Sequence, residues 1–276
     1  MGTAPGAGIA AGMHPEFSKW LDAEAPGDGA PDHSTRETPP MPPRAVLIDF
    51  FGTLARATAS VGLDEILARH GYTLPDHLHE VWWSGDLDGV EHAEQSRSRE
   101  HYLAWQRERL LAMLHEADVH PGEHDRILAD LQAGRAERVL EAYDEVPGAL
   151  AALRDRGVLL VVCSNWDWDL EPAIEETGLL DLLDVLVSSA WAGARKPHPE
   201  IYRYTLDKAG LAPDEVLFVG DTWGPDVAGP LAAGMTPAYL ERPGHWPDAT
   251  RPADISGVPV ARIRDLAGVV RLVESD

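Results

Sequence analysis

The chain has 276 residues, of which 44% are hydrophobic and 25% are charged, and its formal net charge is −23. This composition is typical of a globular protein with one large domain, or a core with a smaller insert. Because so negative a surface repels nucleic acids and anionic membranes, neither is expected as a partner. The single cysteine, Cys163, excludes an internal disulfide. With no signal-peptide pattern at the N-terminus, these features favour a cytoplasmic location.

Residues 1–43 differ in composition from the rest of the chain. They are rich in Ala, Gly, Pro and acidic residues, and four prolines lie close together at their end: Pro39, Pro40, Pro42 and Pro43. Such a segment buries too little apolar surface to offset the entropy lost on ordering. We therefore predict a disordered N-terminal extension over residues 1–43.

Four short apolar runs follow, each ending in polar residues or glycine, and they cover Ala45–Ile48, Val158–Cys163, Val185–Val187 and Val216–Val219. Continuous apolar runs of this length are typical of buried parallel strands. Helical patterns alternate with the runs and end at glycines, as in 147–156 and 201–209. The alternation predicts an α/β fold built on a doubly wound, Rossmann-like parallel sheet.

Residues 57–140 interrupt this alternation. Their apolar residues recur at helical spacing and no clear strand is visible. We predict an inserted all-α domain over 57–140, with 44–56 and 141–276 forming the α/β core. The chain should cross between the two near Arg56 and Tyr143.

Chemically active side chains follow the predicted strands. Asp49 follows the first run, Ser164 and Asn165 the second, and Asp221 the fourth, while Lys196 lies in the loop after the third. Ligands bind at the carboxyl ends of strands in doubly wound sheets, so these groups should converge. A carboxylate can attack as a nucleophile, and a lysine and a hydroxyl can hold a transferred anionic group. A second carboxylate nearby favours a divalent cation.

Four motifs together resemble those of the haloacid dehalogenase superfamily, in the superfamily's order. They are Asp49-Phe50-Phe51-Gly52-Thr53-Leu54, Ser164-Asn165, Lys196-Pro197, and Gly220-Asp221-Thr222 with Asp226. The resemblance extends from about Arg44 to the C-terminus. The helical insert after the first motif is similar to the cap domain that superfamily members carry there.

The resemblance implies roles for individual residues. Asp49 would be the nucleophile, and Thr53, Ser164 and Lys196 would be catalytic residues. Substrate would be bound by Ser164, Asn165 and Lys196. The expected Mg²⁺ would be held by Asp49, the backbone carbonyl of Phe51, Asp221 and Asp226.

Phe51 departs from the phosphatase pattern. Phosphatases of the superfamily carry an Asp at this position as general acid and base, a contribution worth roughly 10²–10⁴-fold in rate. We therefore predict Mg²⁺-dependent hydrolysis of a small, anionic phosphate ester with weakened acid catalysis.

Phe51 also leaves two alternatives open, namely carbon–halogen hydrolysis as in the haloacid dehalogenases, and a non-catalytic descendant that binds a phosphorylated ligand. The retained Asp221 is unlike the dehalogenases, which typically replace that residue. Phosphonate cleavage is disfavoured because it needs a cap lysine, and the lysines of the chain are Lys19, Lys196 and Lys208. The substrate and the oligomeric state are not readable from the sequence.

Overall fold

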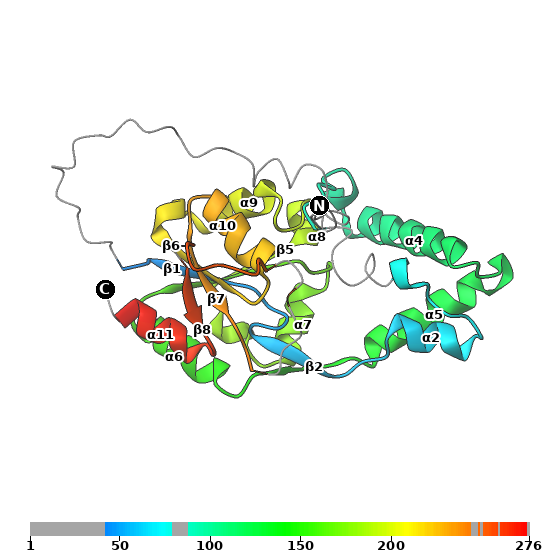
Figure 1. The fold of residues 1–276 in the computed structure, drawn as a ribbon, viewed down its shortest axis with the longest axis horizontal. Coiled ribbons are helices and arrows are strands. Elements are labelled where there is room, and N and C mark those ends of the chain that lie inside the picture. The colour runs from blue at the N-terminus through cyan, green and yellow to red at the C-terminus, as the bar shows by residue number, and fades with distance from the viewer. Residues whose placement is uncertain (1–41, 79–87, 244–247, 249–250, 259, 275–276) are drawn as a thin grey trace, which may run out of the picture. The chain divides into compact units, whose positions relative to one another are not determined.

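A computed structural model describes residues 42–78, 88–243, 248, 251–258 and 260–274 of the chain. The predicted N-terminal extension lies outside the described residues up to residue 41. The core is a six-stranded parallel sheet with strand order β5-β4-β1-β6-β7-β8 (Figure 1). The strands are β1 (Ala45–Ile48), β4 (Leu159–Ser164), β5 (Val185–Ser188), β6 (Val216–Gly220), β7 (Thr236–Leu240) and β8 (Ala261–Ile263). The predicted doubly wound α/β fold is confirmed.

The central strand β1 is buried on both faces, and alternate residues contribute to two apolar clusters. Val46 and Ile48 pack with one group of helices, α6 (Val146–Asp155), α7 (Leu170–Glu176) and α11 (Ala267–Glu274). Ala45 and Leu47 pack on the other face with α9 (Pro199–Ala209). The short helices α8 (Ser189–Ala192) and α10 (Gly229–Ala232) contact α9. This two-sided burial explains why the strands are continuous apolar runs.

Helix α9 shows how local sequence sets the boundaries of an element. Pro199 occupies the first turn, where its missing N–H is not needed, and the ring of His198 accepts a hydrogen bond from the Glu200 N–H at 3.3 Å. Gly210 ends the helix in the left-handed conformation, with φ of 67°.

The inserted segment contains the helices α2 (Leu63–Arg69), α4 (Arg99–Glu116) and α5 (His124–Ala136), with an apolar cluster of their own. Ile66, Leu114 and Ile127, one from each helix, are fully buried there. The expectation of helices alone over 57–140 fails at both ends. There β2 (Ala55–Ala59) pairs antiparallel with β3 (Val139–Ala142), apart from the core sheet. The two crossings of the chain satisfy each other's backbone groups in this ribbon.

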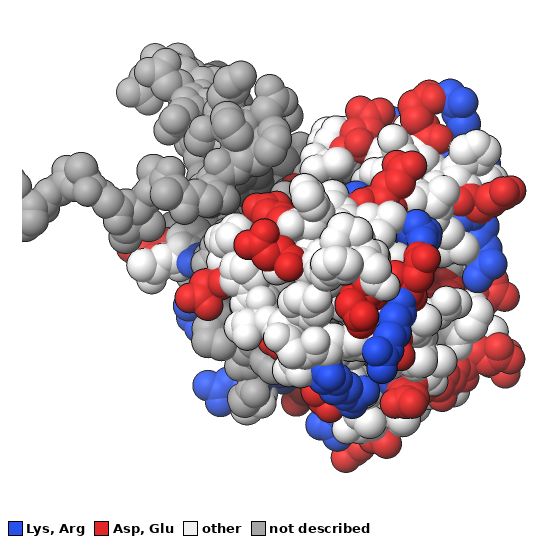
Figure 2. Space-filling view, turned by 90° about the vertical axis from the view of Figure 1, so that its right-hand side faces the viewer, with Lys and Arg blue, Asp and Glu red and all other residues white. Residues whose placement is uncertain are grey.

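Charged side chains of both signs are interspersed on the surface seen from the side of the inserted helices (Figure 2). Among the described helices, none combines the length and apolarity that crossing a membrane requires.

Candidate active site

The parallel register brings the ends of three strands together. Ile48 at the end of β1 is paired with Val162 of β4 on one side and Val219 of β6 on the other. Asp49 follows β1, and its N–H donates to the Val219 carbonyl at 2.9 Å. Ser164 ends β4 and Asp221 follows β6, so the predicted groups share one edge of the sheet.

Lys196 lies among these carboxylates and is 1% exposed. Its Nζ donates to Asp49 Oδ1 at 2.8 Å and to Asp226 Oδ1 at 2.6 Å. Burial alone would lower the pKa of Lys196, but the charges of Asp226 and Asp49 outweigh burial and raise it. The lysine is therefore a fixed positive charge beside Asp49.

Three buried carboxylates form the acidic part of the site. Asp49, Asp221 and Asp226 each place an oxygen within 4.8 Å of the others. Burial raises the pKa of Asp49 and of Asp226, against the opposing charge of Lys196, and Asp221 raises both further. One ammonium leaves the cluster with excess negative charge when all three are ionised. Carboxylate oxygens are the ligands that Mg²⁺ prefers, so this donor set fits a divalent cation.

Two hydroxyl groups orient two of the carboxylates. Ser164 Oγ donates to Asp49 Oδ1 at 2.9 Å, and Thr53 Oγ1 donates to Asp221 Oδ1 at 2.9 Å. Both residues are buried. The structure thus brings Thr53 and Ser164 into the same cluster as Asp49 and Lys196. The position of Ser164 at a strand end predicts this for Ser164, and the family resemblance implies it for Thr53.

Two glycines allow the carboxylates to approach the backbone. Gly52 has φ of +86°, and a Cβ there would lie 2.4 Å from Asp221 Oδ2. A Cβ at Gly220 would lie 2.2 Å from Asp226 Cγ. Asp226 itself lies in a π-helical turn (Gly224–Ala228), a local form that recurs at functional sites. The spacing from Asp221 to Asp226 therefore depends on small residues and an unusual turn.

Asn165 contacts the backbone of the lysine loop. Its Oδ1 accepts from the Lys196 N–H at 2.7 Å, and its Nδ2 donates to the Lys196 carbonyl at 2.9 Å and to Asp88 Oδ1 at 3.0 Å. The predicted substrate contact of Asn165 stays a prediction. Phe51 lies two residues after Asp49 with its ring centroid 6.1 Å from that of Trp166. Its side chain has no proton to transfer.

A family model described as haloacid dehalogenase-like hydrolase matches residues 43–234, which is more than half of the chain. The chain belongs to the haloacid dehalogenase-like hydrolases. This hydrolase is similar to (S)-2-haloacid dehalogenase 4A of Burkholderia cepacia, at 27% identity over 74% of the chain and 86% of that relative.

A phosphatase and a nucleotidase are also similar to the hydrolase. Phosphoserine phosphatase of Thermus thermophilus is 33% identical over 49% of the chain and 52% of its own length. Pyrimidine 5′-nucleotidase YjjG of Escherichia coli is 31% identical over 45% of the chain and 53% of its own length. The hydrolase thus spans about half the length of these two relatives.

Solved structures share the fold of the hydrolase. A haloacid dehalogenase family hydrolase from Deinococcus radiodurans R1 with bound phosphate and sodium matches with a TM-score of 0.56 and 25% identity, over 85% of this chain and 96% of the other. L-2-haloacid dehalogenase from Xanthobacter autotrophicus matches with a TM-score of 0.59 and 24% identity, over 84% of this chain and 98% of the other.

The inserted segment brings further polar side chains to the hydrolase core. Asp167, just after β4, accepts from Tyr102 at 3.0 Å, from Arg135 at 2.9 Å and from Gln106. Burial and the charge of Asp167 raise the pKa of Tyr102, which keeps its proton. No sequence motif marks Asp167 or Asp88, so both were missed.

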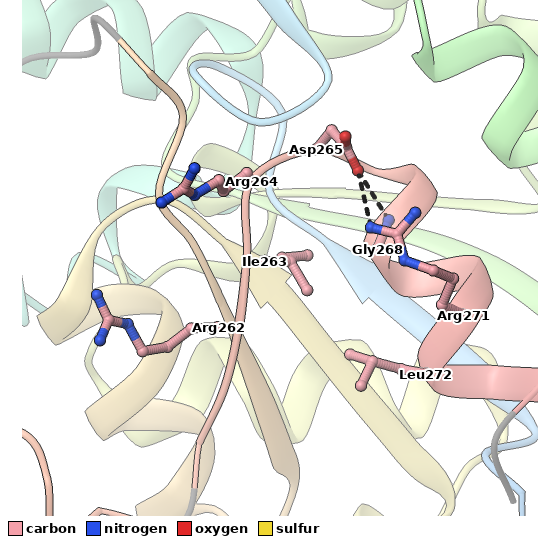
Figure 3. A pocket seen from close by; sticks show the side chains of 7 residues that line it. All are labelled: Arg262, Ile263, Arg264, Asp265, Gly268, Arg271 and Leu272. Atoms are coloured by element: carbon pink, nitrogen blue, oxygen red, sulfur yellow. Dashed lines mark hydrogen bonds and ion pairs between the residues drawn. The ribbon is translucent and has the colours of Figure 1, made fainter.

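A pocket of about 430 Å³ lies elsewhere on the hydrolase, between the end of β8 and α11. In Figure 3, Asp265 contacts the N–H of Gly268 and the guanidinium of Arg271, while Ile263 and Leu272 lie between the arginines. The residues that line this pocket include no member of the carboxylate cluster, so it is separate from the candidate active site.

Proposed function

We propose that this hydrolase cleaves small, anionic phosphate esters in a Mg²⁺-dependent reaction through a phosphorylated Asp49. The observation that carries the proposal is the cluster of Asp49, Asp221 and Asp226 around Lys196. Carbon–halogen hydrolysis by a carboxylate needs one nucleophile and a halide site. Three carboxylates within 4.8 Å are better suited to binding a divalent cation.

Each residue has a distinct task in the proposed reaction. Asp49 attacks phosphorus, the ester oxygen leaves with the bonding electron pair, and water then hydrolyses the acyl phosphate to regenerate the carboxylate. Lys196 and Ser164, which already hold Asp49 Oδ1, stabilise the negative charge on the transferred group. Thr53 orients Asp221 for the metal and assists binding of the phosphoryl group. Bound Mg²⁺ would supply charge neutralisation at the phosphoryl oxygens.

Phe51 shapes the substrate range. With no acid two residues after the nucleophile, the leaving oxygen must take its proton from water, so good leaving groups are favoured. The same residue supports the second candidate, dehalogenation, because its apolar ring stands two residues after Asp49 and lies 6.1 Å from the ring of Trp166. The likeness to (S)-2-haloacid dehalogenase 4A favours this candidate as well.

We further propose that residues 57–140 act as a cap over the core formed by 44–56 and 141–276. The hydrogen bonds of Tyr102 and Arg135 to Asp167 attach the inserted helices beside the loop that follows Ser164. A cap attached there limits the entry of water and selects substrate by its side chains.

The test measures phosphate release from p-nitrophenyl phosphate and, in a separate assay, chloride release from 2-chloropropionate. Both use the full chain, with Mg²⁺ and with EDTA. We expect phosphate release that requires Mg²⁺ and is abolished by Asp49→Asn, since an amide does not form the acyl phosphate. The matched control is Asp155→Asn, the same change at an exposed position on α6, which should keep full activity.

The outcomes separate the candidates. Chloride release that is insensitive to EDTA and absent in Asp49→Asn would replace phosphatase with dehalogenase. An Asp49→Asn variant that keeps more than a trace of the wild-type rate would overturn the nucleophile assignment for either reaction.

A further inference from the structure

The segment 88–92 of the insert runs beside the loop that carries Lys196. The Gly89 N–H donates to the Lys196 carbonyl at 3.3 Å, and the Arg195 N–H donates to the Val90 carbonyl at 3.0 Å. Further along, the His92 N–H donates to the Gly193 carbonyl at 2.6 Å. An antiparallel bridge between residues 91 and 194 completes the pairing. The insert thus holds the backbone of the lysine loop directly.

Asp88 adds a side-chain contact at the end of this pairing. Its Oδ1 accepts from Asn165 Nδ2 at 3.0 Å and lies 3.6 Å from the guanidinium of Arg195. Its side chain is 24% exposed, so water only partly competes for these contacts. Asp88 therefore contacts both Asn165 and Arg195 of the lysine loop.

Asn165 is hydrogen-bonded to both Asp88 and the backbone of Lys196. The Asn165 amide bonds both backbone groups of Lys196, through Oδ1 to its N–H and through Nδ2 to its carbonyl. Asp88 accepts from the same Nδ2 and so fixes the rotation of the amide plane. A rotated amide loses both bonds to Lys196 together.

The position of Lys196 matters because its ammonium makes two short contacts. Nζ lies 2.8 Å from Asp49 Oδ1 and 2.6 Å from Asp226 Oδ1. A displacement of about 1 Å at a catalytic group can cost up to 10²-fold in rate. The contacts from the insert add to those of Asn165 in restricting movement of this loop.

We propose that Asp88 is a positioning residue that acts through Asn165 to tie the placement of Lys196 to the docking of the inserted segment. The proposal rests on the proposed function, since it assigns to the insert a part in placing the lysine that neutralises Asp49. Asp88 does not touch the reacting atoms. Its effect is on the loop 193–196 and should be greater on kcat than on KM.

The first measurement is p-nitrophenyl phosphate turnover with Mg²⁺ by Asp88→Ala and Asp88→Asn. We expect Asp88→Ala to lower kcat about ten-fold with KM within about two-fold of wild type, as the loss of one hydrogen bond to a charged group predicts. Asp88→Asn keeps an oxygen that accepts from Asn165 and should restore most of kcat. The matched control is Glu91→Ala, which removes an exposed carboxylate from the same segment and should leave kcat unchanged.

The second measurement does not need activity. Amide hydrogen exchange of the peptide that contains residues 193–196 should be faster in Asp88→Ala than in wild type and near wild type in Asp88→Asn. Thermal unfolding of each variant checks the fold. If Asp88→Ala fails to fold, Asp88→Ser takes its place, because it keeps a polar group at this half-buried position.

Together the two measurements distinguish failure of this proposal from failure of the proposed function. Faster exchange with reduced kcat, both restored by Asp88→Asn, supports the proposal. Unchanged exchange, or faster exchange with unchanged kcat, overturns it. If the wild type does not hydrolyse the ester, the proposed phosphatase function fails; the exchange result then still decides whether Asp88 fixes the lysine loop.

Discussion

At the scale of single residues, the site is organised by one buried ammonium among three carboxylates. Lys196 holds Asp49 and Asp226 through the two oxygens that face it, and Thr53 holds Asp221. The three carboxylates thus keep fixed orientations, with an oxygen of each within 4.8 Å of the others. The metal-binding role that the motif implies for Asp221 stays a prediction.

Phe51 gives the sharpest residue-scale prediction. If phosphate esters are the substrate, Phe51→Asp should raise kcat for alkyl phosphates by about ten-fold or more, because it restores a proton donor to the leaving oxygen. The gain should be small for aryl phosphates, whose leaving groups need little protonation. Steady-state turnover of both ester classes, with thermal unfolding as a check, measures the effect.

The matched control for this prediction is Phe51→Asn, which has the size of Asp but no transferable proton. Either polar side chain loses the packing of Phe51 against Trp166, so both variants should be destabilised alike. Equal alkyl-phosphate rates in the two variants would show that protonation comes from elsewhere, or that the dehalogenase candidate is the correct one.

At the scale of elements, Arg242 joins the two crossings between core and insert. Arg242 lies just after β7. At the crossing from the core into the insert, it donates to the Thr53 carbonyl at 2.6 Å and to the Gly52 carbonyl at 3.2 Å. At the crossing from the insert back into the core, it donates to Glu145 at 2.7 Å, and its guanidinium carbon lies 3.7 Å from the ring centroid of Tyr143. One planar side chain thus contacts both chain crossings at the core-side end of the β2–β3 ribbon, together with the loop that follows Asp49.

We predict that Arg242→Met lowers the free energy of unfolding by about 2–4 kcal/mol, because it leaves buried carbonyls and Glu145 without their donor. Arg242→Lys should rescue little, since a single ammonium does not reproduce the fork of the guanidinium. Urea denaturation measures both. The control is Arg262→Met, which breaks an exposed pair with Glu241 and should cost less than about 1 kcal/mol. Equal losses at the two positions would contradict the role given to Arg242.

At the scale of the whole molecule, His92 links the pH response to the contact between insert and core. Its ring stacks on Trp105 of α4 with centroids 4.9 Å apart and is 2% exposed. Burial, followed by the charge of Arg195 in the core, lowers the pKa of His92 to about 4, and Arg109 on α4 adds to this effect. The histidine is therefore neutral in the folded protein at neutral pH.

The sign of the pH effect follows from proton binding. Between about pH 6.5 and pH 4 the unfolded chain protonates His92 and the folded protein does not, so this residue lowers stability as pH falls. Asp49 and Asp226 act in the opposite sense because their pKa values are raised. The test is therefore the difference between wild type and His92→Gln.

We predict that the free energy of unfolding of His92→Gln, measured relative to wild type, rises by about 1–2 kcal/mol as the pH is lowered from 7.5 to 5. Urea denaturation at each pH measures it. His115→Gln, at an exposed position on α4, should show no such change. A constant difference between His92→Gln and wild type would mean that His92 titrates normally in the folded protein.

The sequence by itself determined the sheet, the family and the groups at the strand ends. Asp49, Ser164 and Asp221 each directly follow or end a buried apolar run, so short-range pattern and the geometry of parallel sheets placed them together. Strand β7 and the edge strand β8 were not predicted, because β7 contains Pro237 and β8 has only three residues. The β2–β3 ribbon was missed because β2 (ARATA) and β3 (VLEA) contain few β-branched residues and no aromatic ones.

Only the tertiary structure decided how the insert contacts the site. Asp88 and Asn165 are 77 residues apart in the chain, Tyr102 and Asp167 are 65 apart, and Arg242 and Thr53 are 189 apart. In each pair one partner, namely Asp88, Tyr102 or Arg242, is a polar side chain with no periodicity or neighbouring motif to mark it. Hydrogen-bond partners at such separations are set by the packing of whole elements, because a side chain's direction is fixed only when its helix or loop is docked.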